Sequence, residues 1–167
     1  MNARVSPMHW RAMLTAAFAA CVVAGLGAFV TDLGPWYYHL AEPPWKPPDW
    51  LFGPAWTFIF AMAALSGYLC WSRGPRYSPN TARVLALFTL NAILNIAWSV
   101  LFFRLHRLDW ALVEVALLWL SIAALMVLVA RSSTLASWLL LPYLAWVSFA
   151  GMLNLALVRL NGPTGGG

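Results

Sequence analysis

Residues 36–50 read WYYHLAEPPWKPPDW and separate two long apolar runs of the chain. The stretch holds three tryptophans, and its four prolines fall within six residues, at Pro43, Pro44, Pro47 and Pro48. Proline lacks a backbone N–H, fixes φ and pushes the preceding residue toward extended geometry. The stretch is therefore predicted to be a stiff, non-helical connection that carries aromatic side chains. Such a loop is suited to cover the end of a helix bundle as a lid, or to rest its rings among lipid headgroups.

The composition of the chain around this loop is typical of a membrane protein. Of its 167 residues, 62% are hydrophobic and only 9% are charged, and the mean hydropathy is +0.74. A soluble domain of this length needs more charged surface than that. The net charge of +5 comes from 10 basic and 5 acidic residues that are spread singly, so no basic cluster indicates nucleic-acid binding.

Five apolar segments are long enough to cross a bilayer as helices, which takes about 20 residues each. Residues 1–161 are predicted to form one all-α integral membrane domain, a bundle of five transmembrane helices with the Pro- and Trp-rich lid loop between the first and the second. Residues 162–167 are predicted to be a flexible tail. The five helices are expected at about residues 13–30, 51–71, 84–103, 110–130 and 135–158.

The first apolar segment has features of a secretory signal peptide, but its apolar run is long for one, and we expect a retained helix. Small residues recur in it every four positions, at Ala16, Ala20, Ala24 and Ala28. Small side chains at this spacing let two helix backbones approach closely. This face is expected to pack inside the bundle or against a second subunit.

Polar side chains recur within the third span. Asn91, Asn95 and Ser99 follow one another at four-residue intervals and so share one helix face, which lipid cannot solvate. They are expected to face the inside of the bundle. There they would hold helices together by hydrogen bonds, line a ligand cavity among apolar groups, or do both.

Glu114 is the one acidic residue well inside a predicted span. An acid within the membrane is a functional candidate by default. The structural alternatives are that its carboxylate reaches the membrane interface, or that it pairs with Arg104 or Arg107 across the short preceding loop. No metal is predicted, because the cysteines show no CxxC spacing and the three histidines lie far apart in the sequence.

The chain holds 11 tryptophans, which is many for its length. Those near span ends are explained by an interfacial aromatic belt. Trp98 and Trp146 lie deeper, and Trp56 lies close to the end of its span that meets the loop. A tryptophan inside a bundle needs space for its ring and a partner for its N–H. Together these rings could clamp a flat, apolar ligand.

The order and spacing of these motifs resemble the translocator protein family, also called tryptophan-rich sensory proteins or TspO/MBR. The loop looks like the family's first-loop pattern, WYxxLxxPxWxPPxW. Each motif is modest alone, but together they are specific and extend over most of the chain. The matching segments are Trp36–Trp50, Pro54–Thr57, Leu94–Trp98 with Phe102 and Phe103, Trp110–Leu112 with Glu114, Pro142–Trp146, and Leu153–Asn154 with Arg159.

The resemblance implies a five-helix bundle, usually a homodimer, with a cavity that the first loop closes. Family members bind tetrapyrroles, and animal members also bind cholesterol and benzodiazepine-type drugs. A tetrapyrrole-binding receptor, sensor or transporter is therefore expected, with protoporphyrin IX or haem as its ligand and no required cofactor. Its expected partners are membrane lipid and a second copy, without nucleic acid. Its expected location is the bacterial cell envelope, with inner and outer membrane both open.

The residues expected to contact the ligand follow from motif positions and from the loop and tryptophan arguments. The propionates of a porphyrin would pair with Lys46, Arg104 or Arg107 where these reach the mouth of the cavity. The ligand-binding residues are predicted to be Trp36, Trp45, Trp50, Trp56, Phe60, Asn91, Asn95, Trp98, Trp110, Trp146 and Ala150.

This chain departs from the family pattern at three positions. Phe60 stands where a tyrosine is common, so one hydroxyl is lost. Leu155 stands where the animal cholesterol motif needs a tyrosine, and Asn91 stands where animal members have the longer glutamine. A porphyrin is therefore a better match than a sterol.

Two other functions stay open. Some bacterial family members degrade protoporphyrin in light, a reaction attributed to cavity tryptophans that match Trp56 and Trp146 here. These two residues are the catalytic candidates if that reaction occurs. A proton-coupled transporter of small solutes would instead use an intramembrane acid such as Glu114.

Overall fold

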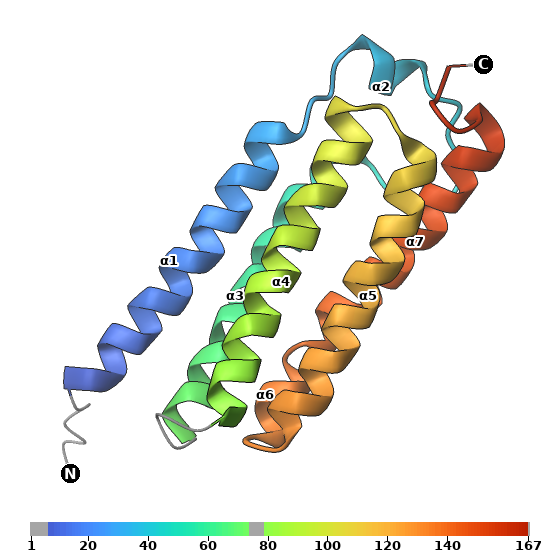
Figure 1. Ribbon diagram of the computed structural model, residues 1–167. Coiled ribbons are helices and arrows are strands. Elements are labelled where there is room, and N and C mark those ends of the chain that lie inside the picture. Colours follow the sequence, from blue (N-terminus) through green and yellow to red (C-terminus); the bar gives the residue numbers. More distant parts are fainter. Residues whose placement is uncertain (1–6, 74–78, 167) are drawn as a thin grey trace.

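The computed structural model describes residues 7–73 and 79–166, and every regular element in these ranges is a helix or helical turn (Figure 1). Residues 1–6 of the predicted domain and Gly167 of the predicted tail lie outside the described residues. The long helices are α1 (Pro7–Val30), α3 (Phe52–Arg73), α4 (Pro79–Ser99), α5 (Leu108–Ala130) and α7 (Leu141–Asn161). The short elements are α2 (Pro35–His39), the 3-10 turn η1 (Asp49–Leu51), the π-helical turn η2 (Val100–Arg104) and α6 (Thr134–Trp138).

Five stretches of the described chain are long and apolar enough to cross a bilayer, and they coincide with the five predicted spans. The predicted all-α transmembrane bundle is thereby confirmed. The last four stretches extend a few residues beyond the predicted bounds, because a helix continues through the interfacial residues that flank its apolar centre. The stretches are Met13–Val30, Asp49–Ser72, Asn80–Arg104, Leu108–Ala130 and Thr134–Asn161.

The fifth span is divided, although one continuous helix was predicted. Helix α6 ends at Trp138, and α7 begins at Leu141 with Pro142 in its first turn. Proline has no N–H for an intrahelical bond, so it is accommodated at a helix start. At its other end α7 stops at Gly162, whose φ of 76° favours glycine.

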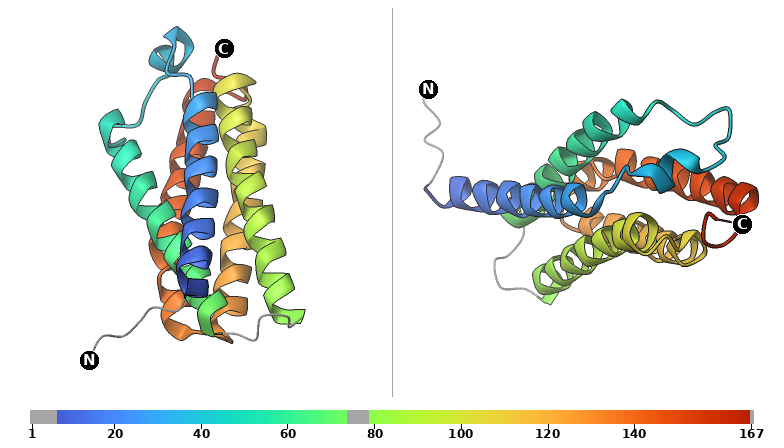
Figure 2. Two further views of the ribbon diagram at one scale, coloured as in Figure 1. Left: turned by 90° about the vertical axis from the view of Figure 1, so that its left-hand side faces the viewer. Right: turned by 90° about the horizontal axis from the view of Figure 1, so that it is seen from above.

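Helix α5 lies between α4 and α7 and is the most buried of the spans (Figure 2). Its residues Leu108, Ile122, Leu125 and Val129 have no exposed surface. Helix α1 lies at the edge of the bundle against α3 and α4, and most of its large apolar side chains face outward. In a membrane such side chains contact lipid or another subunit.

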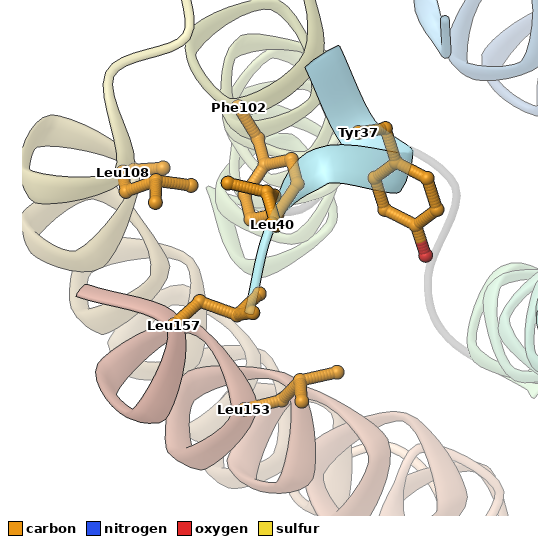
Figure 3. Packing of buried hydrophobic residues seen from close by; sticks show 7 residues of the cluster. Tyr37, Leu40, Phe102, Leu108, Leu153 and Leu157 are labelled. Atoms are coloured by element: carbon orange, nitrogen blue, oxygen red, sulfur yellow. The ribbon is translucent and has the colours of Figure 1, made fainter. Parts of the chain in front are cut away.

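The loop between α1 and α3 crosses one end of the bundle, where the C-terminus and the α4–α5 connection also lie (Figure 1). Tyr37 and Leu40 of this loop are buried. Figure 3 shows them beside apolar side chains of η2, α5 and α7. The loop therefore covers this end of the bundle, as predicted. Its buried partners are Phe102, Leu108, Ala111, Leu153 and Leu157.

Candidate ligand-binding site

Six aromatic rings meet between α3 and α7 and form what we call the aromatic cluster. Trp56 is central to it: its ring stacks on Phe60, with 5.3 Å between the centroids. It meets Tyr143 at 6.0 Å and Trp146 at 6.5 Å, both edge to face. These are favourable geometries for aromatic pairs. The cluster consists of Phe52, Trp56, Phe60, Tyr143, Trp146 and Phe149.

Helical spacing brings these rings together. The three rings of α3 follow at four-residue intervals and those of α7 at three-residue intervals, so each set lies toward one side of its helix. From the loop, Trp45 meets Phe149 edge to face at 6.0 Å. Ala150 follows Trp146 by about one turn and is half-buried. The structure therefore brings Trp56 to Trp146 and Trp45 to Phe149, while the contact of these residues and of Ala150 with a ligand stays a prediction.

A buried polar network joins α4, α5 and α7 beside the aromatic cluster. Asn95 Nδ2 donates to the Tyr143 hydroxyl at 3.2 Å, and Asn91 Nδ2 donates to Ser121 Oγ at 2.8 Å. Ser99 Oγ donates to the Asn95 carbonyl at 3.4 Å. All five side chains are buried. The predicted polar face of α4 therefore looks into the bundle and holds helices together, while its contact with a ligand stays a prediction.

Trp98 belongs to a second set of rings nearer the loop. It stacks on Phe102 at 5.0 Å, and Phe102 meets Trp36 edge to face at 6.1 Å. Trp36 in turn stacks on His106 at 4.0 Å. Trp98 also packs against the same apolar core as the aromatic cluster, so the two sets of rings adjoin.

Two indole N–H groups in these sets have no hydrogen-bond acceptor among the described residues. They are Nε1 of Trp98 and Nε1 of Trp146, and both atoms are buried. A buried donor without an acceptor costs free energy. Each is thus available to hydrogen-bond a polar group of a ligand that enters between the helices.

Charged residues hold the loop in shape. Lys46 Nζ donates to Glu42 Oε1 at 2.5 Å and to Asp49 Oδ1 at 2.7 Å, while the Tyr37 hydroxyl donates to Asp49 Oδ1 at 2.8 Å. Burial opposes the charge of Lys46, but its hydrogen bonds to Asp49 and Glu42 outweigh this and raise its pKa above the usual range. Burial raises the pKa of Tyr37 to about 12. Lys46, expected at a propionate, is therefore already paired with two carboxylates.

The two arginines expected near a ligand or near Glu114 also bind elsewhere. Arg107 contacts both carboxylate oxygens of Asp109, at 2.8 and 2.6 Å. Arg104 donates to a backbone carbonyl of α1 at 2.9 Å and lies 3.9 Å from Asp32. The alternative that Glu114 pairs with either arginine is therefore wrong. Arg104 and Arg107 remain partly exposed, so exchange of their present partners for a propionate is open to them.

Two predicted ligand residues lie outside both sets of rings. The side chain of Trp50 is 71% exposed and that of Trp110 is 55% exposed. The structure does not bring them to the aromatic cluster, and their contact with a ligand stays a prediction.

An apolar groove of about 410 Å³ separates parts of α1 and α3. Phe60 lines it, so this ring belongs both to the groove and to the aromatic cluster. Ala20 and Ala24 form part of its other wall. Of the small-residue face predicted on the first span, Ala20 and Ala24 are thus turned toward α3, whereas Ala28 is exposed.

The end of α7 is tied to the loop. The Ala41 N–H donates to Asn161 Oδ1 at 2.7 Å, and Asn161 Nδ2 donates back to the Ala41 carbonyl at 2.9 Å. Beyond it, the Asp109 N–H donates to the Pro163 carbonyl at 3.2 Å. The first residues of the tail therefore contact the bundle, and the flexibility of the tail stays a prediction.

Tyr143 is the main site residue that sequence reasoning missed. It contacts Trp56 with its ring and Asn95 with its hydroxyl, and so joins the aromatic cluster to the polar network. The available signal was a hydroxyl-bearing ring three residues before Trp146 on an apolar span. Asn161 was missed because nothing in the sequence shows that a residue 120 positions after Ala41 lies beside it.

Comparison with known proteins agrees with this architecture. The sequence profile of the TspO/MBR family matches residues 14–160. The chain is 40% identical over 145 residues to the tryptophan-rich protein TspO of Chlorobaculum tepidum, and this alignment covers 84% of this chain and 90% of that protein. It is 36% identical over 132 residues to the translocator protein of Homo sapiens, covering 79% and 78% of the two chains. It is 32% identical over 154 residues to the tryptophan-rich sensory protein of Cereibacter sphaeroides, covering 92% and 94%. With five membrane-spanning helices and this match over nearly its whole length, the chain belongs to the TspO/MBR family of integral membrane proteins.

Proposed function

We propose that this protein binds tetrapyrroles such as protoporphyrin IX or haem between α3 and α7, and acts as a membrane receptor, sensor or transporter for them. The aromatic cluster is the observation that carries this proposal. A flat, conjugated ring system binds well among aromatic side chains that offer both faces and edges. Trp56, Phe60, Tyr143 and Trp146 provide such surfaces within one small region.

Three further features support a ligand of this kind. The buried Nε1 atoms of Trp98 and Trp146 offer donors to polar atoms on the ligand. The loop covers the nearby end of the bundle and brings Trp45 onto the ring of Phe149. Helix α3 leans away from the rest of the bundle toward the loop end (Figure 2). Its rings Phe52 and Trp56 still meet Trp146 of α7. A modest movement of α3 or of the loop would then admit a planar molecule.

A titration in the dark tests the binding proposal. Protoporphyrin IX is added to the purified protein in detergent while tryptophan fluorescence is followed. We expect saturable quenching, with a dissociation constant that rises about fivefold or more in Trp146→Ala, because a lost aromatic contact of this size costs about 1–3 kcal/mol. Trp138→Ala is the matched control, since Trp138 is 62% exposed on α6, outside the cluster. Equal loss in both variants, or no saturation in the wild type, contradicts the proposal.

A second function, light-dependent degradation of the bound porphyrin, is favoured by the pair Trp56 and Trp146. Their rings meet at 6.5 Å, and indole is easily oxidised. Illumination of the complex should then bleach the porphyrin faster than illumination in detergent alone. The conservative variants Trp56→Phe and Trp146→Phe should retain binding but lose this excess rate. If bleaching is the same with and without protein, the protein is a binder only.

We further propose that the protein forms a homodimer in the bacterial cell envelope. Bacterial relatives of similar length support this location. The outward apolar surface of α1, including Phe18 and Phe29, supplies a face that lipid or a second copy would cover. Light scattering of the protein–detergent complex gives the number of chains, and one chain per complex would contradict the dimer.

A further inference from the structure

Glu114 stands out among the charged residues of the described chain. It lies in the membrane-spanning helix α5, and its side chain is only 6% exposed. Neither carboxyl oxygen has a hydrogen-bond partner among the residues that the structure describes. At a rise of about 1.5 Å per residue, it lies about 9 Å along the helix from Leu108, well below the end of the span. The proposed tetrapyrrole chemistry makes no use of this group.

The surroundings of Glu114 connect it to the aromatic cluster. Glu114 and Ser121 are two turns apart and share one face of α5, and Ser121 binds Asn91 of α4. Leu118, one turn after Glu114 on α5, packs in the same apolar core as Tyr143 of α7 and Trp56 of α3. The ring of the same tyrosine meets Trp56. The aromatic cluster and the face of α5 that carries Glu114 therefore belong to one packed core.

No cation in the described elements packed against α5 is placed to neutralise Glu114. The titratable groups of α7 are Tyr143, which lies in the aromatic cluster, and Arg159, which is exposed near the loop. On α4 the charged residue is Arg83, exposed toward the opposite end, and α6 carries none. Arg104 of η2 binds the backbone of α1. On α5 itself, Asp109 is paired with Arg107.

An ionised carboxylate in this position would be buried in a bilayer without a counter-ion or a hydrogen-bond donor. Burial of this kind strongly favours the neutral acid, which gains its proton from water. A ligand beside Tyr143 would exclude water further and would increase that preference. The carboxyl would then act as a proton carrier rather than as a fixed charge.

We propose that Glu114 is a proton-binding site inside the membrane, which takes up one proton from solution as the aromatic cluster is filled. The step converts a carboxylate and a solvent proton into a carboxylic acid, and no other bond changes. Its coupling to a ligand rests on the proposed function, whereas the binding of a proton by Glu114 does not. A transporter with this property would move ligand and proton together.

The first test is infrared spectroscopy of the free protein in an ester-free detergent. The C=O stretch of a protonated carboxyl is resolved from the bands of carboxylates. Between about pH 6 and pH 7, exposed and ion-paired acids are ionised, so the wild type should show one such band that Glu114→Gln lacks. Asp32→Asn, which removes an exposed acid, should leave the band intact. Absence of the band in the wild type throughout the range from pH 5 to pH 8 overturns the proposal.

The second test is the pH dependence of binding, with nickel etioporphyrin as the probe. This tetrapyrrole has neither propionates nor exchangeable ring protons, so any linkage belongs to the protein. Uptake of one proton predicts up to about tenfold tighter binding for each pH unit of acidification, over the range where Glu114 is ionised in the free protein. The dissociation constant of Glu114→Gln should change less than about twofold over that range. Glu114→Asp, which keeps a carboxyl, should show the pH dependence of the wild type.

The outcomes separate the two proposals. An equal slope in the wild type and in Glu114→Gln overturns the coupling. If the probe does not bind at any pH, the proposed function and the coupling fall together, and the infrared band decides the proton site alone. If Glu114→Gln does not fold, a pH-indicator dye counts the protons that the wild type takes up on addition of the probe, at a pH where the infrared band of the free protein is absent. A count near one supports the coupling, and a count of zero overturns it.

Discussion

The shape of the loop depends on a few charged side chains. Lys46 is the only lysine of the chain, and only 8% of its side chain is exposed. It lies between Glu42 and Asp49, and its Nζ is 4.8 Å from the centroid of the Tyr37 ring. The prolines make the segment stiff, but stiffness alone does not decide which rings point inward. The hydrogen bonds of Lys46 and Tyr37 determine which rings point inward, because they tie both ends of the proline-rich stretch together.

Replacement of Lys46 by methionine should loosen the loop while keeping most of the apolar stem. Two carboxylates then lose their shared donor, at a cost of about 1–3 kcal/mol for hydrogen bonds to charged groups. Hydrogen–deuterium exchange of residues 36–51 should accelerate about tenfold, with little change in α5. Arg83→Met, at an exposed position on α4, is the control. Unchanged exchange in the Lys46 variant would show that the apolar contacts of the loop suffice.

Alkaline pH should open the same network. The folded-state pKa values of Tyr37 and Lys46 are both raised, the former to about 12, compared with an ordinary value of 10.0. A raised folded-state pKa means that the unfolded loop releases its proton first, so stabilisation is complete below about pH 10 and is lost as the pH rises through about 12. The difference in tyrosinate absorbance between wild type and Tyr37→Phe measures this titration. A midpoint near 10 would mean that Tyr37 is not held in the network.

At the level of elements, the five spans could be predicted because their length is set by the bilayer and their apolar runs are unambiguous. The division of the fifth span was harder to predict, since Pro142 is compatible with a kink as well as with a new helix start. Helix α4 also continues into a π-helical turn, where Leu105 N–H donates to the carbonyl of Val100 at 3.0 Å. Nothing in the hydropathy of that segment indicates the wider turn.

The candidate site was predictable in part for the same reason. Helical spacing placed Asn91 and Asn95 on one face, and the structure shows that face buried. Spacing within one helix does not tell which helix lies opposite, so the bond from Asn95 to Tyr143 needed the tertiary structure. The pairing of Lys46 with Glu42 and Asp49 likewise depends on how the loop folds back on itself.

The contact between α4 and α5 can be measured through Asn91 and Ser121, whose side chains are 2.8 Å apart. A double-mutant cycle with Asn91→Ala and Ser121→Ala should give a coupling energy of about 0.6 kcal/mol, and at most about 1.7 kcal/mol, as for other hydrogen bonds between membrane helices. Thermal unfolding in detergent provides the four stabilities. Asn91→Ala combined with Ser148→Ala, on α7, is the control and should be additive. A coupling of zero for the first pair would mean that the bond contributes nothing to the bundle.

Considered as a whole, the molecule is closed at one end by segments that lie far apart in the sequence. The loop, the end of α7, the first tail residues and the α4–α5 connection meet there (Figure 1). Asn161 binds Ala41, and the ring of Trp36 stacks on His106. At the other end, α6 packs against α3 and α5, and Asn80 of α4 donates to Ser132. A ligand that enters at the loop end must therefore loosen contacts of α7 and the tail together with those of the loop.

Two adjacent glycines of the tail test whether this closed end acts as one unit. A Cβ on Gly165 would lie 2.7 Å from Leu40 Cδ2 and 2.8 Å from Trp36 Cζ2. The φ of Gly165, 67°, already disfavours other residues. A Cβ on Gly166, in contrast, would meet nothing within 4 Å. Gly165→Ala should displace the tail from Trp36, because the stiff indole cannot give way as Leu40 can. Hydrogen–deuterium exchange of residues 36–41 should then accelerate about fivefold or more, because alanine at this φ adds a strain of about 1 kcal/mol or more. A bound porphyrin should dissociate faster by a similar factor. Gly166→Ala should match the wild type in both measurements. If the two variants behave alike, the tail contributes nothing to closure, and the loop is held by Asn161 and the apolar contacts of Tyr37 and Leu40 alone.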